Sequence, residues 1–347
     1  MSSSLPKHIL VIRMSAMGDI AITVPVLRSL INEYPDVRIT YVTRPFFSPI
    51  VAYIPNTTIL PAKLDEEHKG ISGLYQLAKQ AKQNGVDTVI DLHGVLRSHM
   101  MKAYFTLSGI PVYQIDKGRK EKRTLVRAEN KTIKPLKPTY ERYAEVLRKA
   151  GFDFNIEPST ALIPRQKMSE AVLNLIGSQT GKWIGIAPFA QHPGKEYPLE
   201  KIKAVANQLI QQDYSVFLFG GGDKEKNLLD TLAKDQTKIL NCTYKFTFAE
   251  EIQLISNLDL MISMDSGNGH LAALFGIPVL TLWGVTHPYA GFAPYGQPHQ
   301  HQLLPDRDTY PLLPVSIYGK HNVPNYDEAI SSISPKLIVE KVNTILN

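Results

Sequence analysis

The sequence predicts an α/β protein with parallel sheets, built as two Rossmann-like domains. Short runs rich in β-branched and aromatic residues recur, and each precedes a stretch with helical spacing. Such alternation is typical of parallel sheets covered by helices. The chain has 347 residues, more than one domain usually holds. The strand, turn and helix pattern that begins at His8 returns at Trp183, almost half the chain later. We therefore expect one α/β unit to occur twice.

The expected elements follow from these runs in order. Residues 20, 24, 27 and 31 give the first helix an apolar stripe, and Pro25 lies early in it or kinks it. Residues 284–327 lack clear periodicity and predict a long irregular segment near a site, whereas "SPKLIVEKVNTILN" predicts a capped helix at the end of the chain. The expected strands are "HILVI", "RITYVT" and "DTVIDL" in the first half, then "WIGIA", "SVFLFG", "DLMIS" and "PVLTLW". We expect an N-terminal acceptor-binding domain over 1–165, a C-terminal donor-binding domain over 166–332, and a final helix over 333–347 that packs back on the N-terminal domain.

Composition places the chain among ordinary globular proteins. Hydrophobic residues make up 44% and charged residues 20%, which is usual for that class, and no stretch is apolar enough to span a bilayer. The apolar run in "MSSSLPKHILVIRM" is too short for a signal peptide. The single cysteine, Cys242, excludes an internal disulfide and suits a reducing compartment. We expect a cytoplasmic protein.

Positive charge is concentrated in residues 117–149. This segment holds twelve Lys or Arg against four Glu, although the whole chain carries only +6. A local basic excess indicates an anionic partner: a phosphorylated substrate, a membrane surface or nucleic acid. A solvated helix face with a loop explains the same charges. Because no RNA- or DNA-binding module is visible, we expect no nucleic-acid partner.

Asp19 lies where the first strand turns into the first helix, in "MSAMGDI" at residues 14–20. Gly18 allows the chain to turn tightly before it. Two interpretations stay open for this carboxylate. It could cap the helix, or it could act as a general base that meets a hydroxyl proton at about 3 Å.

A second turn of this kind is "MDSGNGH" at residues 264–270. Asp265 ends an expected strand, and the two glycines of the turn keep the backbone open ahead of a helix. The amides from Ser266 to His270 could surround a diphosphate. A plain turn capped by Asp265, with His270 as a buried core histidine, is the alternative. The segment has neither the Walker lysine nor the spacing of a dinucleotide fingerprint.

Three further loops follow expected strands, and each also has an ordinary structural explanation. Lys195 in "APFAQHPGKEYP" can carry positive charge to a leaving phosphate. The glycines of "FGGGDKEK" could support a nucleotide, with Asp223 or Glu225 near sugar hydroxyls, and His93 and Arg97 of "DLHGVLRSHM" could meet an anionic acceptor. No metal site is expected, because the histidines lack ligand spacing and "DRD" at 306–308 follows no clear strand.

Four segments together resemble the lipopolysaccharide heptosyltransferases of glycosyltransferase family 9. They are "VIRMSAMGDIAITVPVLRSLINEYPDVRITYVTRP", "DLHGVLRS", "APFAQHPGKEYP" and "MDSGNGHLAALFGIPVLTLWGVTHP", in the family's order and spacing. The resemblance implies a GT-B fold, in which two Rossmann-like domains face each other across a cleft. It also implies an ADP-heptose donor, a lipopolysaccharide core acceptor of the Kdo/lipid A type, and inversion at the anomeric carbon without a metal ion or other cofactor.

The resemblance also assigns roles to individual residues. Asp19 matches the catalytic carboxylate of the S-x-x-G-D motif, which favours the general base, and Lys195 matches the donor-phosphate lysine. Asp265, Gly267 and His270 match the D-[TS]-G-x-x-H donor loop. The residues expected to bind the donor are Gly18, Gln191, Gly221, Asp223, Asp265, Ser266, Gly267, Asn268 and His270. Those expected to bind the acceptor are His93, Arg97, Arg119, Lys120 and Arg123.

Departures from the family pattern keep two alternatives open. Ala190, Gln191, Asn268 and Gly269 stand where relatives commonly carry other residues, so the donor could differ, or the chain could bind a nucleotide sugar without transferring it. The basic segment, with Lys117 and Lys122 among its likeliest contacts, predicts attachment to acceptor phosphates or to the cytoplasmic face of the inner membrane. A nicotinamide-dependent oxidoreductase is disfavoured by the absent fingerprint.

Overall fold

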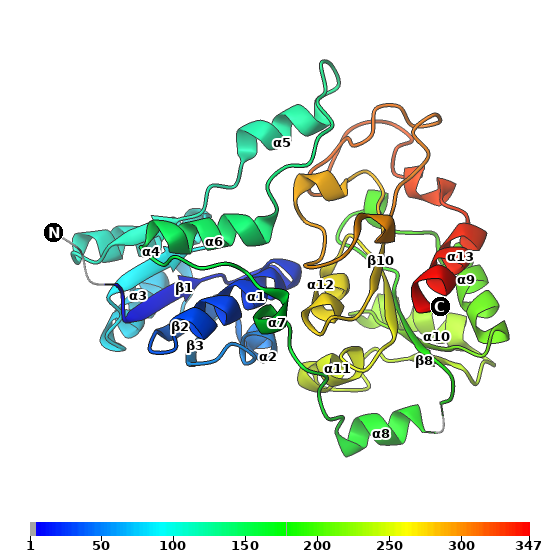
Figure 1. The fold of residues 1–347 in the computed structure, drawn as a ribbon, viewed down its shortest axis with the longest axis horizontal. Helices are drawn as coiled ribbons and strands as arrows, with labels where there is room; N and C mark the ends of the chain where they lie inside the picture. Colours follow the sequence, from blue (N-terminus) through cyan, green and yellow to red (C-terminus); the bar gives the residue numbers. More distant parts are fainter. Residues whose placement is uncertain (1–4, 178) are drawn as a thin grey trace. The chain divides into compact units, whose positions relative to one another are not determined.

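The computed structural model describes residues 5–177 and 179–347, which form two compact units (Figure 1). Unit 1 comprises the residues up to Arg119 together with Thr139–Ile163. Unit 2 comprises Lys120–Pro138 and Pro164–Asn347. Each unit has its own parallel sheet flanked by helices, so the predicted α/β class with two sheets is confirmed.

The sheet of unit 1 has five parallel strands in the order β3-β2-β1-β4-β5. Strands β1 and β4 are buried along their whole length, as expected for parallel strands covered on both faces. The strands are β1 (His8–Ile12), β2 (Arg38–Thr43), β3 (Thr57–Pro61), β4 (Thr88–Asp91) and β5 (Val112–Gln114). The helices are α1 (Met17–Glu33), η1 (Pro45–Phe47), α2 (Ser48–Val51), α3 (Gly70–Gln83), α4 (Leu96–Leu107), α6 (Thr139–Lys149) and α7 (Pro158–Ala161). Because Ile12 pairs with Asp91, the loops that follow β1 and β4 are neighbours at the carboxyl edge of this sheet.

Helix α1 forms as its sequence predicts. The apolar stripe of Ile20, Val24, Leu27 and Ile31 is buried, and Pro25 lies inside the helix. Burial of this stripe fixes the helix against the sheet, so the first turn of α1 stays at the carboxyl end of β1.

The sheet of unit 2 has six parallel strands in the order β11-β10-β9-β6-β7-β8. The strands are β6 (Trp183–Ala187), β7 (Ser215–Leu218), β8 (Ile239–Asn241), β9 (Leu260–Met264), β10 (Val279–Leu282) and β11 (Gln302–Leu303). The α-helices are α8 (Glu170–Ile176), α9 (Leu199–Gln211), α10 (Asp223–Ala233), α11 (Phe248–Ile255), α12 (Gly267–Leu274) and α13 (Pro335–Leu346). Short 3₁₀ turns are η2 (Pro193–Lys195), η3 (Pro288–Ala290), η4 (His299–His301) and η5 (Ala329–Ser332).

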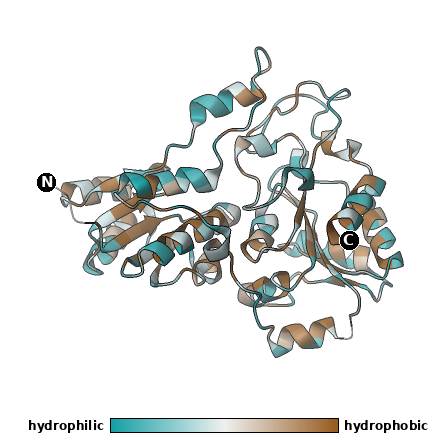
Figure 2. Ribbon diagram, viewed as in Figure 1, coloured by the Kyte–Doolittle hydropathy of each residue, from teal (hydrophilic) through white to brown (hydrophobic). Residues whose placement is uncertain are grey.

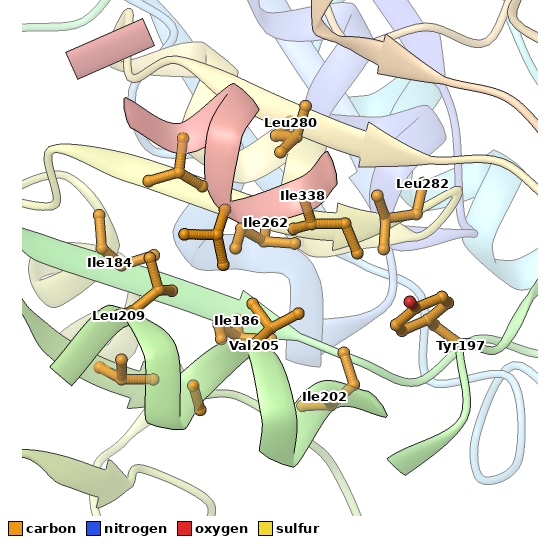
Figure 3. Packing of buried hydrophobic residues seen from close by; sticks show 14 of the residues in the cluster. Ile184, Ile186, Tyr197, Ile202, Val205, Leu209, Ile262, Leu280, Leu282 and Ile338 are labelled. Carbon is orange, nitrogen blue, oxygen red and sulfur yellow. The ribbon is translucent and has the colours of Figure 1, made fainter. Parts of the chain in front are cut away.

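The final helix, α13, packs within unit 2. Ser334 caps it by accepting a hydrogen bond from the Leu337 amide, which confirms the predicted cap. Its apolar residues Ile338, Val339 and Val342 belong to the same buried cluster as β6 and α9, and Figure 3 shows Ile338 in that cluster. The expectation that this helix returns to the N-terminal domain is therefore wrong, because its apolar face is covered by unit 2.

The N-terminal domain is not the contiguous stretch 1–165 that we expected. Residues 120–138, called the basic excursion from here on, leave unit 1 and join unit 2. Helix α5 (Arg119–Val126) begins this excursion and is largely hydrophilic in Figure 2. Its Leu125 is buried with Leu136 and Ala290, and Tyr289, Phe292 and Ile317 pack against them. This small apolar cluster explains why the excursion belongs to unit 2.

Candidate functional site

Asp19 is held in the first turn of α1 by an ion pair with Arg13, the residue that follows β1. Ala16 is the N-cap of α1, so the capping interpretation of Asp19 is wrong. The Asp19 side chain remains 28% exposed, which leaves it accessible to a hydroxyl group.

Arg13 is a site residue that the sequence reasoning missed. It is only 6% exposed, and its Nη1 donates a hydrogen bond to the Leu92 carbonyl at 2.9 Å. Burial alone would lower the pKa of Arg13, but the Asp19 carboxylate and the nearby Tyr143 and Tyr41 together outweigh it, and the pKa is raised. The guanidinium is thus a permanent cation that joins the α1 turn to the loop after β4. A single arginine at the end of the apolar run "HILVI" was the available signal.

Asp91, at the end of β4, orders the neighbouring loop and was also missed. It is fully buried and accepts four hydrogen bonds. They come from the amides of His93 and Gly94 at 2.9 Å, from the Ser98 hydroxyl at 2.9 Å and from Gln114 Nε2 at 2.7 Å. With four donors around it, this carboxylate holds the loop rather than serving a ligand.

His93 and Lys117 add further electrostatic features to the same edge of unit 1. Burial, together with the charges of Arg13 and Lys117, lowers the pKa of His93 to about 4, so the ring is neutral at pH 7. Burial and the nearby charges of Arg13 and Arg119 lower the pKa of Lys117. In the part of the chain that the structure describes, His93 Nδ1 is buried without a hydrogen-bond partner. The positive charges of Arg13, Lys117 and Arg119 lie near the Asp19 and Asp91 carboxylates at this edge, and such cations suit an anionic ligand.

The other predicted acceptor residues are placed differently. Arg97 is exposed in the first turn of α4, and no contact among the described residues joins it to Asp19. Arg119, Lys120 and Arg123 are exposed on α5, and the last two belong to unit 2. Lys122 is only 5% exposed, with its Nζ 4.2 Å from the ring centre of Phe292. The expectation that Lys122 contacts a ligand is therefore wrong, because aromatic rings cover it.

In unit 2, Lys195 and Asp265 form a second ion pair. Strands β6 and β9 are adjacent, with Ala187 opposite Ser263, so the loops that follow them meet at the carboxyl edge of the sheet. Lys195 Nζ lies 3.0 Å from Asp265 Oδ2, and their side chains are 12% and 9% exposed. The Thr286 hydroxyl donates to the same oxygen at 2.8 Å. The sequence-predicted lysine and aspartate are thus brought together.

The predicted donor loop begins α12. Ser266, not Asp265, is the N-cap, so the capping alternative for Asp265 is wrong. Two of the amides expected to surround a diphosphate are already engaged: Ser266 donates to the Met264 carbonyl at 2.7 Å, and Gly269 donates to Ser263 Oγ at 3.2 Å. The amides of Gly267 and Asn268 open the helix, where amides have no intrahelical acceptor. They are the ones left to receive an anion, and His270 is buried one turn further in.

Unit 2 also has a pocket of about 290 Å³ between the loop after β6, which carries Lys195, and the start of α10. Phe189, Tyr197 and Leu228 form apolar walls, and Glu225 lines it as well. Glu225 accepts a hydrogen bond from the Gly221 amide at 2.7 Å, which ties down the glycine turn. Among the other predicted donor residues, Gln191 and Asp223 are exposed, and neither lines this pocket.

Within residues 5–177 and 179–347, no three His, Cys, Asp or Glu side chains gather where they could hold a metal ion. In the same residues, no helix combines the length and the apolar character needed to cross a membrane.

Residues 74–312 match the family model described as glycosyltransferase family 9 (heptosyltransferase), a span of more than half the chain. The chain belongs to glycosyltransferase family 9. The chain is similar to lipopolysaccharide heptosyltransferase 2 of Escherichia coli K12. The two are 24% identical in an alignment 359 positions long, which includes 97% of this chain and 98% of that protein. This family 9 member is therefore an enzyme of glycosyl transfer.

Solved structures support the fold of this family 9 glycosyltransferase. A glycosyltransferase of family 9 from Veillonella parvula DSM 2008 has a TM-score of 0.74 and 21% identity, covering 98% of this chain and 97% of that one. The E. coli heptosyltransferase WaaC with ADP has a TM-score of 0.69 and 16% identity, covering 97% and 99%. Each of these two structural matches includes both units of this chain. The expected GT-B class is therefore confirmed for the fold of each unit.

Proposed function

We propose that this family 9 enzyme moves a heptose from ADP-heptose to a lipopolysaccharide core acceptor of the Kdo/lipid A type, with inversion and without a metal ion. The observation that carries the proposal is an accessible carboxylate, Asp19, paired to a buried arginine at the carboxyl edge of a Rossmann-like sheet. Family membership and the names of the relatives support the sugar and the acceptor class.

In this mechanism Asp19 is the general base. The acceptor hydroxyl gives its proton to the Asp19 carboxylate while its oxygen forms a bond to the anomeric carbon of the heptose. The bond from that carbon to the diphosphate breaks, and its electron pair leaves with ADP. Arg13 holds the Asp19 carboxylate in place through their ion pair. General-base assistance contributes about 10² to 10⁴ fold to the rate.

Unit 2 supplies the charges that stabilise the leaving diphosphate. Lys195 exchanges its partner Asp265 for the phosphate, and the free amides of Gly267 and Asn268 donate to the same anion. Positive charge from these groups supports a reaction that needs no metal ion. The pocket next to the Lys195 loop, with apolar walls and Glu225, fits a nucleoside whose ribose hydroxyls bind a carboxylate.

The acceptor is proposed to be anionic because cations surround Asp19. Arg13, Lys117 and Arg119 are electrostatically coupled at this edge, and they suit the carboxylate or phosphate groups of a Kdo/lipid A core. The exposed basic residues of the excursion suit the same phosphates or the anionic headgroups of the inner membrane. We therefore infer a cytoplasmic enzyme that works at the cytoplasmic face of that membrane.

Replacement of Asp19 by Asn tests the proposal. We expect turnover of ADP-heptose with a Kdo/lipid A acceptor to fall by about 10² to 10⁴ fold, with the dissociation constant of ADP-heptose nearly unchanged. Asp36→Asn, at an exposed aspartate of unit 1, is the matched control and should keep full turnover.

Three outcomes would contradict parts of the proposal. Full turnover in Asp19→Asn would remove Asp19 as the base. Tight ADP binding with no transfer to any acceptor would favour a nucleotide-sugar-binding protein. Faster transfer from another nucleotide sugar, in a panel that follows nucleotide release, would change the donor.

A further inference from the structure

The irregular segment before α13 contains a tight turn, Ser316–Lys320, built around the buried hydroxyl of Ser316. That hydroxyl donates to the Lys320 carbonyl at 2.8 Å and accepts the Gly319 amide at 2.8 Å. These bonds close the turn on itself. Gly319 has φ of +111°, a conformation that favours glycine.

The turn lies directly against the lysine of the donor site. A Cβ atom on Gly319 would stand 2.7 Å from Lys195 Cδ and 2.7 Å from His192 Cδ2. Real Cβ atoms essentially never approach this closely, so the bare glycine backbone forms a wall along the lysine stem. Lys195 is only 12% exposed, and a displaced stem would take its ammonium away from Asp265.

Main-chain hydrogen bonds connect the Ser316–Lys320 turn to the loop that carries Lys195. The Val285 amide donates to the Gly194 carbonyl at 2.9 Å, and the Val285 carbonyl accepts the amides of Val315 and Ser316 at 3.0 and 3.1 Å. Val285 alone therefore connects the turn to Gly194, the residue before Lys195. On its other side, the Tyr318 ring lies 5.6 Å from the ring of Phe292 and 5.7 Å from Lys122 Nζ.

We propose that Gly319 is a positioning residue of the donor site, and that the Ser316–Lys320 turn holds the Lys195 side chain where it can meet the leaving diphosphate. The proposal rests on the donor role proposed above for Lys195. It gives the irregular segment a function in the reaction, although none of its residues needs to touch substrate.

The test is a double-mutant cycle on ADP affinity, measured by calorimetry on the full chain. Gly319→Ala should weaken ADP binding by about tenfold or more, the scale of losing one hydrogen bond to a charged group. Lys195→Ala removes the ammonium group through which Gly319 would act on ADP, so adding Gly319→Ala to it should cost no further ADP affinity, although His192 Cδ2 still lies 2.7 Å from the new Cβ. Additive losses, or an unchanged affinity in Gly319→Ala, would overturn the proposal.

Two controls separate displacement of the lysine from backbone strain and from failure of the donor assignment. Gly296→Ala also adds a methyl group at a positive φ of +72°, but nothing lies within 4 Å of it, so it should keep wild-type affinity. After reductive ¹³C-methylation, the Lys195 dimethylamine resonance should shift in Gly319→Ala and stay in place in Gly296→Ala. An unmoved resonance overturns the positioning role, whereas a moved resonance with unchanged ADP affinity in Lys195→Ala overturns only the donor role of that lysine.

Discussion

At the scale of single residues, Arg13 links several parts of the unit 1 site. It pairs with Asp19 and donates to the Leu92 carbonyl. It also interacts electrostatically with Tyr41, His93 and Lys117. Because Arg13 is the charged group in direct contact, its removal leaves the carboxylate without its main partner.

Replacement of Arg13 tests this relation through kcat. In Arg13→Met, the Asp19 carboxylate loses the partner that orients it in the first turn of α1, so kcat should fall by about tenfold or more. Arg13→Lys restores the charge and should restore part of kcat. Arg28→Met removes another arginine of unit 1, which donates to the Tyr53 and Leu162 carbonyls. This control should lose stability without lowering the kcat of the folded enzyme, and an unchanged kcat in Arg13→Met would contradict the role.

The sequence could predict some site residues and not others. Asp19, Lys195 and Asp265 follow strands in glycine-bearing turns, a pattern that marks ligand sites in parallel sheets. Arg13 and Asp91 were missed because they lie at the ends of apolar strands, where a charged residue acquires its partners only through pairing of β1 with β4. Lys122 was misassigned because the rings that cover it, Phe292 and Tyr318, are remote in the chain.

At the scale of elements, α5 is a basic helix that is anchored by its buried residues while its other basic side chains stay exposed to solvent. Leu125 and Lys122 are buried in unit 2, and the C-terminal end of the excursion is fixed where the Leu136 amide donates to the Tyr289 carbonyl at 2.9 Å. Lys120, Arg123 and Arg127 remain exposed. The excursion therefore carries its positive charge on a fixed support.

Charge reversal on α5 should weaken attachment to anionic vesicles. Lys120→Glu combined with Arg123→Glu removes two basic contacts, each worth about 1 kcal/mol near an anionic surface, so sedimentation with phosphatidylglycerol vesicles should fall by at least about tenfold. Lys203→Glu with Lys234→Glu makes the same charge change at exposed lysines elsewhere in unit 2. Equal binding by both double variants, or binding insensitive to salt, would contradict a role for the excursion.

The strands that the sequence did not predict are the edges of the two sheets. Strands β3 and β5 border the first sheet, and β11 and β8 border the second. Three of them have three residues or fewer, too short for any periodic pattern. The central strands were predictable because burial on both faces demands unbroken apolar runs.

At the scale of the whole molecule, the two units should respond differently to acid. Burial lowers the pKa of His93 to about 4 in unit 1 and that of His287 to about 4 in unit 2, and it also lowers the pKa values of His8 and His301. Because the unfolded chain binds these protons at higher pH, each histidine costs stability as pH falls below about 6.5. In unit 2 alone, burial raises the pKa of Glu251 to about 7, so this group adds stability as pH falls and offsets part of the loss.

Between pH 6.5 and pH 5 we therefore expect the free energy of unfolding of unit 1 to fall relative to that of unit 2 by about 2 kcal/mol. The histidines of the two units offset one another, so this difference is the contribution of Glu251. Both tryptophans, Trp183 and Trp283, lie in unit 2. As pH falls, thermal unfolding followed by far-UV circular dichroism, which reports on both units, should show an additional transition at lower temperature. The unfolding midpoint followed by tryptophan fluorescence, which reports on unit 2, should move less. A fluorescence midpoint that falls as far as the dichroism midpoint would contradict the expectation.

The excursion also has a consequence for engineering acceptor or donor preference by recombination with relatives. A hybrid joined only near residue 163 would take Leu125 and Leu136 from one parent and Ala290 from the other, and the small cluster they share would be mismatched. Hybrids that instead exchange residues 120–138 together with the second half keep all three from one parent. Crossover points at 119, 138 and 163 are therefore the ones expected to yield folded, exchangeable modules.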